Sequence, residues 1–359
     1  MDLSSLGWDD FFANHFQPFS DTGFVPARVA LEHKHVCLLH SAAGEFTATC
    51  TGRLLHEAAA RTDLPAVGDW VVARPRPGEA QADIHAVLPR RTKFSRRASG
   101  DEETEQIVAT NIDTVFLVTA LDDHFNLRRI ERYLAVAWES GAQPVVVLNK
   151  TDLHPDPAAA LAEVTALAPG ASVVALSAAR DADPATALAA WLGTGRTVAL
   201  LGASGVGKST LINRLLGTDR QLTGATSSTH GKGRHTTTHR ELIVAPSGAL
   251  VIDTPGMREL QLWDVAAPTL DETFADIAAL AAGCRFSDCT HRTEPGCAVQ
   301  AALAAGTLAP DRWQSYAKLQ REQAYAARKA DPHLARASRA NWRKITKGQR
   351  ARARLEGDE

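Results

Sequence analysis

The run GASGVGKS predicts a loop that binds the phosphates of a nucleotide, because it fits the pattern G-x-x-x-x-G-K-[ST]. The apolar run TVALL precedes this loop, and the run STLINRLLG, which has helical character, follows it. Glycines let backbone N–H groups wrap around phosphates, and a helix N-terminus favours negative charge. We expect Lys208 to reach the outer phosphates and Ser209 to ligate Mg²⁺. The other phosphate-binding positions are Gly202, Ala203, Ser204, Gly205, Val206, Gly207 and Thr210.

The tetrapeptide DTPG, which ends a further apolar run, predicts the second phosphate-side element. In nucleotide hydrolases an acidic residue at such a place holds the Mg²⁺ shell, and a glycine amide senses the γ-phosphate. We therefore expect Asp253 to act on Mg²⁺ and Gly256 to contact phosphate. The polar segment between the two motifs offers one more Mg²⁺ ligand, and spacing alone leaves the choice open among Thr236, Thr237 and Thr238.

The residue that would orient the attacking water does not stand in its usual place. Ras-type enzymes carry a glutamine directly after this glycine, whereas the present chain has Met257. A thioether cannot orient water through strong hydrogen bonds, so we expect slow hydrolysis or a substitute group. His235 is the candidate, since a neutral imidazole can position water. A solvated loop histidine without a role is an equally good interpretation.

The tetrapeptide NKTD, at the end of the run PVVVLNKTD, predicts how the base is recognised. The phosphate loop alone does not choose between ATP and GTP. The carboxylate of Asp152 can accept hydrogen bonds from the N1 and N2 groups of guanine, and adenine lacks this donor pair. We expect Asn149 to contact the base edge and hold the loop, and the stem of Lys150 to cover the ring. Thr151 completes this nucleotide-binding segment.

The order of these motifs along the chain is unusual, because the base-reading segments precede the phosphate loop. The second of them is SAA, which follows its own apolar run, and the backbone amides of Ser177 and Ala178 could close over the base. The series is a circular permutation of the usual one. Permutation is tolerated because the termini of a domain often lie close together. Residues 180–196 are long enough to supply a helix and a connector.

Four metal-ligating side chains are concentrated in the run GCRFSDCTHRTEPGC. Cys284, Cys289, His291 and Cys297 form the pattern C-x4-C-x-H-x5-C, which suits a closed, structural, tetrahedral Zn²⁺ site. The spacing is not that of a standard zinc finger, so ordinary buried cysteines remain the alternative. The five cysteines of the chain are an odd number, which argues against a disulfide framework.

The elements that must position these residues follow from the hydrophobic pattern. From residue 112, apolar strand-like runs alternate with helical patterns at 126–142 and 157–169, which predicts a parallel, doubly wound sheet. The run ELIVAPSGALVID predicts two strands around a turn. Between residue 24 and about residue 97, five short strand-like pieces indicate a small barrel, which the basic run PRRTKFSRR closes. Residues 1–23 are interpreted as a loose extension.

Composition and charge narrow the class of protein. With 359 residues, 45% hydrophobic and 22% charged, the chain has the composition of a soluble protein of two or three domains. It has no apolar run of about 18 residues and no export-like N-terminal pattern, so we expect a cytoplasmic protein. Between Arg312 and Leu355, 13 Lys/Arg residues face two acids, so this segment carries +11 and the rest −13. This asymmetry favours an acidic partner, nucleic acid above all.

In these motifs the sequence resembles the ribosome small-subunit-dependent GTPases, a family of circularly permuted bacterial GTPases. NKTD, GASGVGKST, GRHTTT, DTPGMREL and CRFSDCTHRTEPGCAV carry the resemblance, together with LPAVGDWV and VLPRRTKFSRR. The resemblance implies a multi-domain α/β chain with an OB-fold barrel, a permuted P-loop GTPase domain with a mostly parallel sheet, and a helical zinc-binding domain. The expected ranges are 24–98 for the barrel, 99–265 for the GTPase domain and 266–330 for the zinc-binding domain. The extension takes 1–23 and a basic tail takes 331–359.

The resemblance also implies a function. The family binds the 30S subunit and its 16S rRNA near the decoding region during late maturation, and the subunit stimulates hydrolysis of GTP. In the family's pattern the switch threonine lies two residues after the switch histidine, which gives Thr237 as the Mg²⁺ ligand and His235 as the residue proposed to act in hydrolysis. We expect these two and Lys208 to be catalytic in a monomer with one structural Zn²⁺ and with Mg²⁺ bound alongside GTP.

Three alternatives stay open from the sequence. The first is an RNA-binding protein that nucleotide merely switches, with negligible hydrolysis. The second is a permuted GTPase that acts on the large subunit, and the third is an ATPase. The preferred interpretation is a GTP hydrolase whose barrel, zinc domain and basic tail bind rRNA. In this interpretation, hydrolysis of GTP releases the protein from the small subunit.

Overall fold

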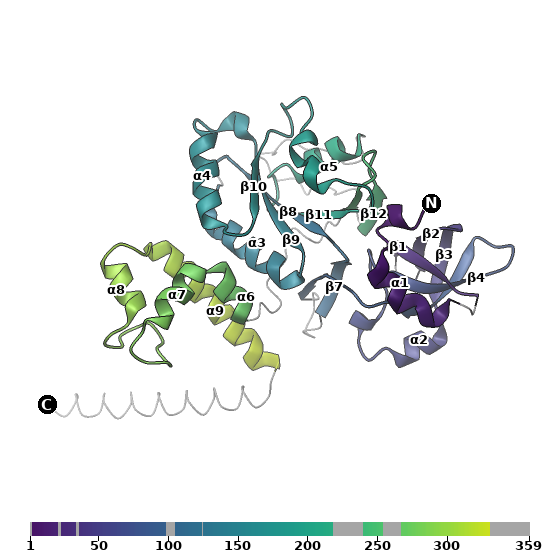
Figure 1. Cartoon of the computed structure of the whole chain (residues 1–359), viewed down its shortest axis with the longest axis horizontal. Helices are drawn as coiled ribbons and strands as arrows, with labels where there is room; N and C mark the ends of the chain where they lie inside the picture. The colour runs from purple at the N-terminus through teal and green to yellow at the C-terminus, as the bar shows by residue number, and fades with distance from the viewer. Residues whose placement is uncertain are drawn as a thin grey trace, which may run out of the picture. The chain divides into compact units, whose positions relative to one another are not determined.

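The computed structural model divides the chain into two compact units, Met1–Trp263 and Asp264–Glu359, each described here by itself (Figure 1). The described residues are 2–20, 23–33, 36–97, 105–123, 125–217, 240–253 and 267–330.

A closed five-stranded barrel forms the beginning of the first unit. Its strands pair in the order β1-β2-β3-β5-β4, and β4 pairs back on β1. Only the β3–β5 pairing is parallel, and the short helix α2 (Gly52–Glu57) lies between β3 and β4 in sequence. This closed order confirms the predicted OB-like barrel. The strands are β1 (Val25–His33), β2 (Val36–Ser41), β3 (Gly44–Cys50), β4 (Trp70–Pro75) and β5 (Gln81–Val87).

The barrel is closed by β4 and not by the basic run PRRTKFSRR, so that part of the prediction is wrong. The second half of this run is β6 (Lys93–Arg97), which pairs antiparallel with β7 (Glu105–Thr110) in a separate two-stranded ribbon. The barrel interior is filled instead by alternating residues of its own strands, among them Val29, Leu39 and Ile84, all of them fully buried.

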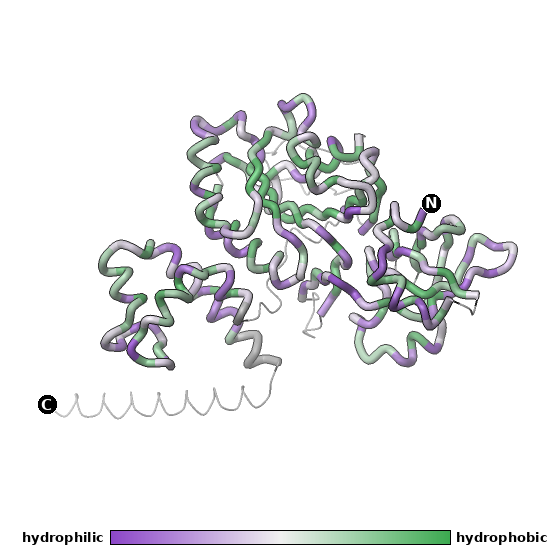
Figure 2. Tube along the Cα trace, in the orientation of Figure 1, coloured by the Kyte–Doolittle hydropathy of each residue, from purple (hydrophilic) through white to green (hydrophobic). Residues whose placement is uncertain are grey.

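The second part of the first unit is a six-stranded sheet in the order β10-β9-β8-β11-β13-β12. The first five strands are parallel and β12 is antiparallel to β13, as the alternation of apolar runs and helices predicts. Apolar residues run along the central strands (Figure 2), and all seven residues of β8 are buried. The strands are β8 (Thr114–Ala120), β9 (Gln143–Asn149), β10 (Ser172–Ala175), β11 (Thr197–Leu201), β12 (Arg240–Val244) and β13 (Leu250–Asp253).

Helices cover both faces of this sheet. Helices α3 (Leu127–Ser140) and α4 (Pro157–Leu167) pack on the face that carries Leu117 of β8, and α5 (Lys208–Leu216) packs on the opposite face with Phe116. Alternating β8 residues therefore face different helices, which is why the strand is apolar throughout. The connector before β11 contains only a short 3₁₀-helix, η5 (Thr186–Trp191), rather than a longer helix.

The sheet continues into the barrel through an edge pairing. β12 pairs antiparallel with β1, with Leu31 opposite Glu241 and Glu32 opposite Arg240. The two sheets therefore form one array of eleven strands.

The N-terminal segment packs on the barrel, so the prediction of a loose extension is wrong. Helix α1 (Asp10–Phe16) begins at Asp9, whose carboxylate accepts a hydrogen bond from the N–H of Phe11 at 3.0 Å. Leu6 and the α1 residue Phe12 are buried in the core, and the ring of Trp8 lies 4.6 Å from that of Trp70. Aromatic side chains bury large apolar areas, so even this short segment gains enough free energy from burial to fold onto the barrel.

A buried guanidinium joins this segment to the rest of the unit. Arg28, on β1, is 1% exposed and donates hydrogen bonds to the carbonyl groups of Leu6, of Gly68 at 3.3 Å and of Asn111 at 3.0 Å. Its guanidinium also lies over the ring of Trp70. These bonds satisfy a charge that would otherwise be costly to bury.

The second unit is helical. Its apolar centre contains Phe274 and Tyr316, whose ring centroids lie 5.4 Å apart, and the guanidinium of Arg312 covers Phe274 and pairs with Asp276 at 2.8 Å. Over the part of the chain that the structure describes, no helix has the length and apolar character needed to cross a membrane. The helices are α6 (Ala267–Thr273), α7 (Ala275–Ala282), α8 (Ala298–Ala304) and α9 (Pro310–Ala330).

We expect the substitution Leu6→Ala to lower the free energy of unfolding of the first unit by about 2 to 5 kcal/mol, because a fully buried side chain is lost from a packed core. Urea denaturation followed by tryptophan fluorescence measures this change. The matched control is Leu153→Ala, which removes the same atoms from a residue that is 60% exposed. Equal unfolding midpoints for the two variants would show that the N-terminal segment is not part of the core.

Candidate functional site

The motifs that were predicted to bind nucleotide converge at one edge of the parallel sheet. Asn149 ends β9, Ser177 lies just beyond β10, the phosphate loop begins after β11, and Asp253 ends β13. The chain order along the sheet reverses between β8 and β11. Ligands of such sheets bind outside the carboxyl ends of the strands at this point of reversal.

The phosphate loop has a backbone that requires glycine. Gly205 and Gly207 have φ values of 82° and 98°, which other residues adopt at a cost. A Cβ atom at Gly207 would lie 2.2 Å from Nδ2 of Asn149, and one at Gly202 would lie 2.2 Å from the carbonyl oxygen of Val118. The loop thus passes so close to β8 and to the base-reading segment that no side chain fits.

Lys208 stands at the start of α5 and closes the phosphate loop on itself. Its ammonium group donates hydrogen bonds to the carbonyl groups of Gly202 at 2.7 Å and Ala203 at 2.6 Å. Ser209 and Thr210 follow in the first turn of α5, where backbone N–H groups favour an anion. The contact between Lys208 and phosphate stays a prediction.

The side-chain amide of Asn149 connects three loops. Its Nδ2 donates to the carbonyl oxygen of Val206 in the phosphate loop at 2.8 Å, and its Oδ1 accepts from the N–H of Ala178 at 2.9 Å. The residue is 2% exposed. Asn149 therefore holds the base-reading loop to the phosphate loop and to the SAA segment, while its contact with the base stays a prediction.

Asp152 is exposed at the same edge, and a hydroxyl group orients its carboxylate. Oδ1 of Asp152 accepts a hydrogen bond from Oγ of Ser177 at 2.5 Å. The N–H of Ser177 in turn donates to Oδ2 of Asp181 at 2.8 Å. The amides of Ser177 and Ala178, which we expected over the base, are thus bonded within the protein in this structure.

Three residues that sequence reasoning missed position these groups. The carboxylate of Asp122, just beyond β8, binds the ammonium group of Lys150 at 2.9 Å. Asp181 binds the amide of Ser177, and Arg214 on α5 donates to the carbonyl group of Asp181 at 2.5 Å. An acidic residue directly after a buried strand was a usable signal for Asp122. Nothing in the local pattern indicated Asp181 or Arg214.

The switch residues lie mostly outside the described part of the chain. This holds for the proposed water-positioning His235, for Thr237 and its neighbours Thr236 and Thr238, and for Gly256 and Met257. Of the predicted magnesium ligands, the structure describes Ser209 in the first turn of α5 and Asp253, which is 9% exposed at the end of β13. An alcohol and a carboxylate at one sheet edge are oxygen ligands of the kind that Mg²⁺ prefers.

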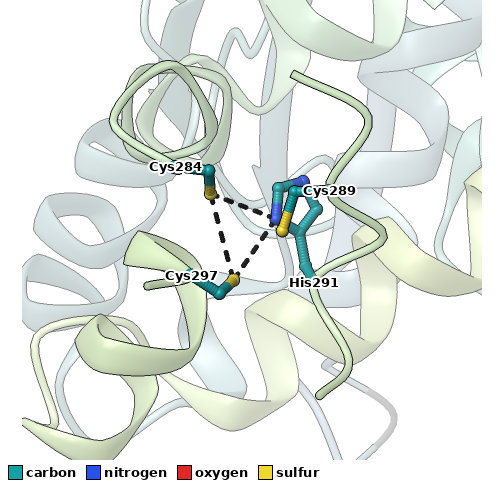
Figure 3. Close-up of side chains that lie close together, drawn as sticks. All are labelled: Cys284, Cys289, His291 and Cys297. Atoms are coloured by element: carbon teal, nitrogen blue, oxygen red, sulfur yellow. Dashed lines mark hydrogen bonds between the residues drawn. The ribbon is translucent and has the colours of Figure 1, made fainter. Parts of the chain in front are cut away.

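The four predicted zinc ligands come together in the second unit (Figure 3). Nδ1 of His291 lies 3.5 Å from the sulfur atoms of both Cys284 and Cys297, and these two sulfurs are 3.9 Å apart. With Cys289 included, all four ligand atoms lie within 4.8 Å of one another. A tetrahedral Zn²⁺ with Zn–S bonds of about 2.3 Å and a Zn–N bond of about 2.0 Å separates its ligand atoms by roughly 3.5 to 3.8 Å. The donor set and its size therefore fit zinc.

Helix α8 and one glutamate orient the ligand loop. The sulfur of Cys297 accepts a hydrogen bond from the N–H of Gln300 at 3.4 Å, and the Gln300 side chain donates to the carbonyl group of His291 at 2.6 Å. The Glu294 carboxylate binds the N–H groups of Thr290 and Arg292 at 3.0 and 2.8 Å. The Thr290 hydroxyl also donates a hydrogen bond to this carboxylate. The hydroxyl bond has the largest effect, and together with the N–H bonds it lowers the pKa of Glu294 to about 2. The loop is thus fixed between the ligands, as a structural site requires.

Comparison with known proteins places these features in a family context. The sequence model of a family described as RsgA GTPase matches residues 87–263. The chain is 68% identical over 365 residues to the "Small ribosomal subunit biogenesis GTPase RsgA" of Opitutus terrae, and the match covers 99% of both chains. It is 44% identical to the protein of the same name from Syntrophotalea carbinolica, over 91% of both chains.

Solved structures give the same fold. The chain resembles YloQ, titled a circularly permuted GTPase, with a TM-score of 0.61 and 22% identity over 85% of this chain and 96% of that one. It resembles YjeQ from Thermotoga maritima with a TM-score of 0.61 and 25% identity over 84% of this chain and 98% of that one. The predicted order of motifs is therefore a real circular permutation.

We expect Asp152→Ala to weaken the binding of GDP roughly 100-fold and to leave the weak binding of ADP unchanged, because only guanine offers two donors to this carboxylate. Titration with fluorescent analogues of the two nucleotides measures both affinities. The control Glu163→Ala removes an exposed carboxylate from α4 and should bind like the wild type. Undiminished preference for GDP in the Asp152 variant would refute this assignment.

Purified protein should contain one zinc ion per chain, and Cys289→Ser should lose most of it because a thiolate ligand is removed. Elemental analysis by mass spectrometry measures the metal content. Cys50→Ser is the matched control, since Cys50 belongs to the barrel of the first unit, and burial raises its pKa so that it stays a thiol. A full zinc content in the Cys289 variant would show that the cluster is not the site.

Proposed function

The chain belongs to the RsgA GTPase family and is a GTP hydrolase, and from this premise we propose that it acts in the late maturation of the small ribosomal subunit. The observation that carries the proposal is the 68% identity, over 99% of both chains, to a protein named as a biogenesis GTPase of that subunit. The nucleotide site is in keeping with this role, because its base- and phosphate-binding segments meet at one sheet edge.

We infer the nucleotide-binding steps from the sequence motifs and from the contacts of the described residues. The Asp152 carboxylate selects guanine, and Lys150, held by Asp122, covers the ring. On binding of GTP, the ammonium group of Lys208 exchanges its bonds to the loop carbonyl groups for bonds to the outer phosphates. Ser209, Asp253 and Thr237 would hold Mg²⁺, which neutralises charge on the phosphates when it is bound.

Hydrolysis needs a group that positions water, and the chain has Met257 where glutamine is usual. We assign this role to His235, as a neutral imidazole. The isolated protein then hydrolyses GTP slowly, and the 30S subunit accelerates the reaction by aligning the switch. Loss of the γ-phosphate releases the protein from the subunit.

The rest of the chain supplies the rRNA contacts. The barrel, the zinc domain and the basic tail at 331–359 bind the backbone and exposed bases of 16S rRNA, as OB folds and Lys/Arg clusters do. The zinc ion would act structurally, because four protein ligands leave no open position. In this proposal the protein works as a monomer in the cytoplasm, where it meets the subunit.

We expect 30S subunits to accelerate multiple-turnover hydrolysis of GTP at least about tenfold, and His235→Ala to lower the stimulated rate roughly 100-fold, because a water-positioning group is lost. Release of inorganic phosphate measures both rates. The control variant is His15→Ala, which removes an exposed imidazole from α1. The control particle is the 50S subunit.

Each outcome separates the alternatives. Without acceleration by 30S subunits the proposed role fails, and the chain is at most a nucleotide-switched RNA-binding protein. Acceleration by 50S subunits alone would assign it to the large subunit. If His235→Ala matches the wild type, the role given to His235 is wrong.

A further inference from the structure

A cavity of about 230 Å³ lies where the barrel, the β6–β7 ribbon and β12 meet. Its walls are mostly apolar and come from segments far apart in the chain, with Cys37 on β2, Leu64 and Pro65 before β4, and Ile107 on β7. None of its lining residues belongs to the base-reading, phosphate or zinc motifs. The nucleotide mechanism therefore leaves this cavity without a role.

One guanidinium in the cavity wall, that of Arg240, forms no ion pair with a carboxylate of the described residues. Arg240, the first residue of β12, is half-buried and donates a hydrogen bond to the carbonyl group of Ile107 at 2.9 Å. Glu32 stands opposite Arg240 in the β1–β12 pairing, but its carboxylate pairs with Arg61 at 3.5 Å. Among the described residues, no carboxylate lies within ion-pair distance of Arg240.

The local charge is positive as a result. The lining contains the guanidinium groups of Arg61 and Arg240 against the single carboxylate of Glu32. Burial lowers the pKa of Arg240, and the positive charges of Arg96 and Arg61 act in the same direction, whereas Glu32 opposes them. A half-buried cation in such surroundings is stabilised by an anion that enters the cavity.

The size and chemistry of the cavity specify an occupant. An apolar cavity of about 150 Å³ can hold a benzene ring, so the present one has room for one or two fused rings with a small substituent. A planar guanidinium binds carboxylate and phosphate groups through two parallel hydrogen bonds. We propose that this cavity binds a small anion with an aromatic or heteroaromatic ring, the ring lying among Cys37, Leu64, Pro65 and Ile107 and the anionic group lying on Arg240.

The test uses two probes of nearly the same shape and different charge, indole-3-carboxylate and indole-3-carboxamide. Each is titrated calorimetrically into the full chain saturated with GDP, so that the nucleotide site is filled. We expect one site and an affinity at least about tenfold higher for the carboxylate. Arg240→Gln should reduce carboxylate binding to the level of the carboxamide. The control Arg53→Gln removes an exposed guanidinium from α2 and should leave binding unchanged.

A second variant keeps the test decisive if Arg240→Gln does not fold. Gln106→Glu is nearly isosteric and keeps an acceptor for Nε of Arg96, which lies 3.1 Å from Oε1 of Gln106. It places a carboxylate in the cavity wall and should weaken binding of indole-3-carboxylate at least about tenfold by repulsion. The proposal is overturned if both probes bind equally or if no binding occurs up to about 10 mM. It is also overturned if the affinity for indole-3-carboxylate is unchanged in every one of the two variants that folds.

Discussion

A buried side-chain amide at the end of β9 holds together the three loops from which the nucleotide site is built. Asn149 donates to the phosphate loop and accepts from the SAA segment, and Gly207 lets the phosphate loop come close enough for this bond. Loss of the amide would leave two buried backbone groups without partners, at a cost of about 1 to 3 kcal/mol each. Because these bonds join loops that lie close together at one edge of the sheet but far apart in the sequence, they survive a change in the order in which the strands are connected. This is why the site tolerates the circular permutation.

The permutation changes what the sheet is attached to. β12 follows the switch segment in sequence and pairs with β1 of the barrel, so the edge of the GTPase sheet and the barrel share one hydrogen-bonded array. Glu241 lies opposite Leu31 of the barrel and also opposite Asp253 of β13. A single residue thus separates the barrel from a predicted magnesium ligand. The cavity at Arg240 lies directly beside this connection.

The two units are stabilised by different means. The first has a large apolar core to which even the N-terminal segment contributes, and the buried Arg28 joins that segment to the barrel and to the loop before β8. The second is small, and its ligand loop between α7 and α8 contains little regular structure. A bound Zn²⁺ there would convert metal affinity into folding free energy, as in other small zinc domains.

The sequence by itself determined the strands of the barrel and of the six-stranded sheet, the helices α3 to α5, the order of the motifs and the cysteine–histidine set, because each is a pattern of a few neighbouring residues. Only the tertiary structure showed that residues 2–20 pack on the barrel, that β4 rather than the basic run closes it, and that Asp122, Asp181 and Arg214 position the base-reading loops. These features depend on contacts between residues tens of positions apart. Local spacing carries no information about such contacts, because they arise only when the packed strands bring distant segments together.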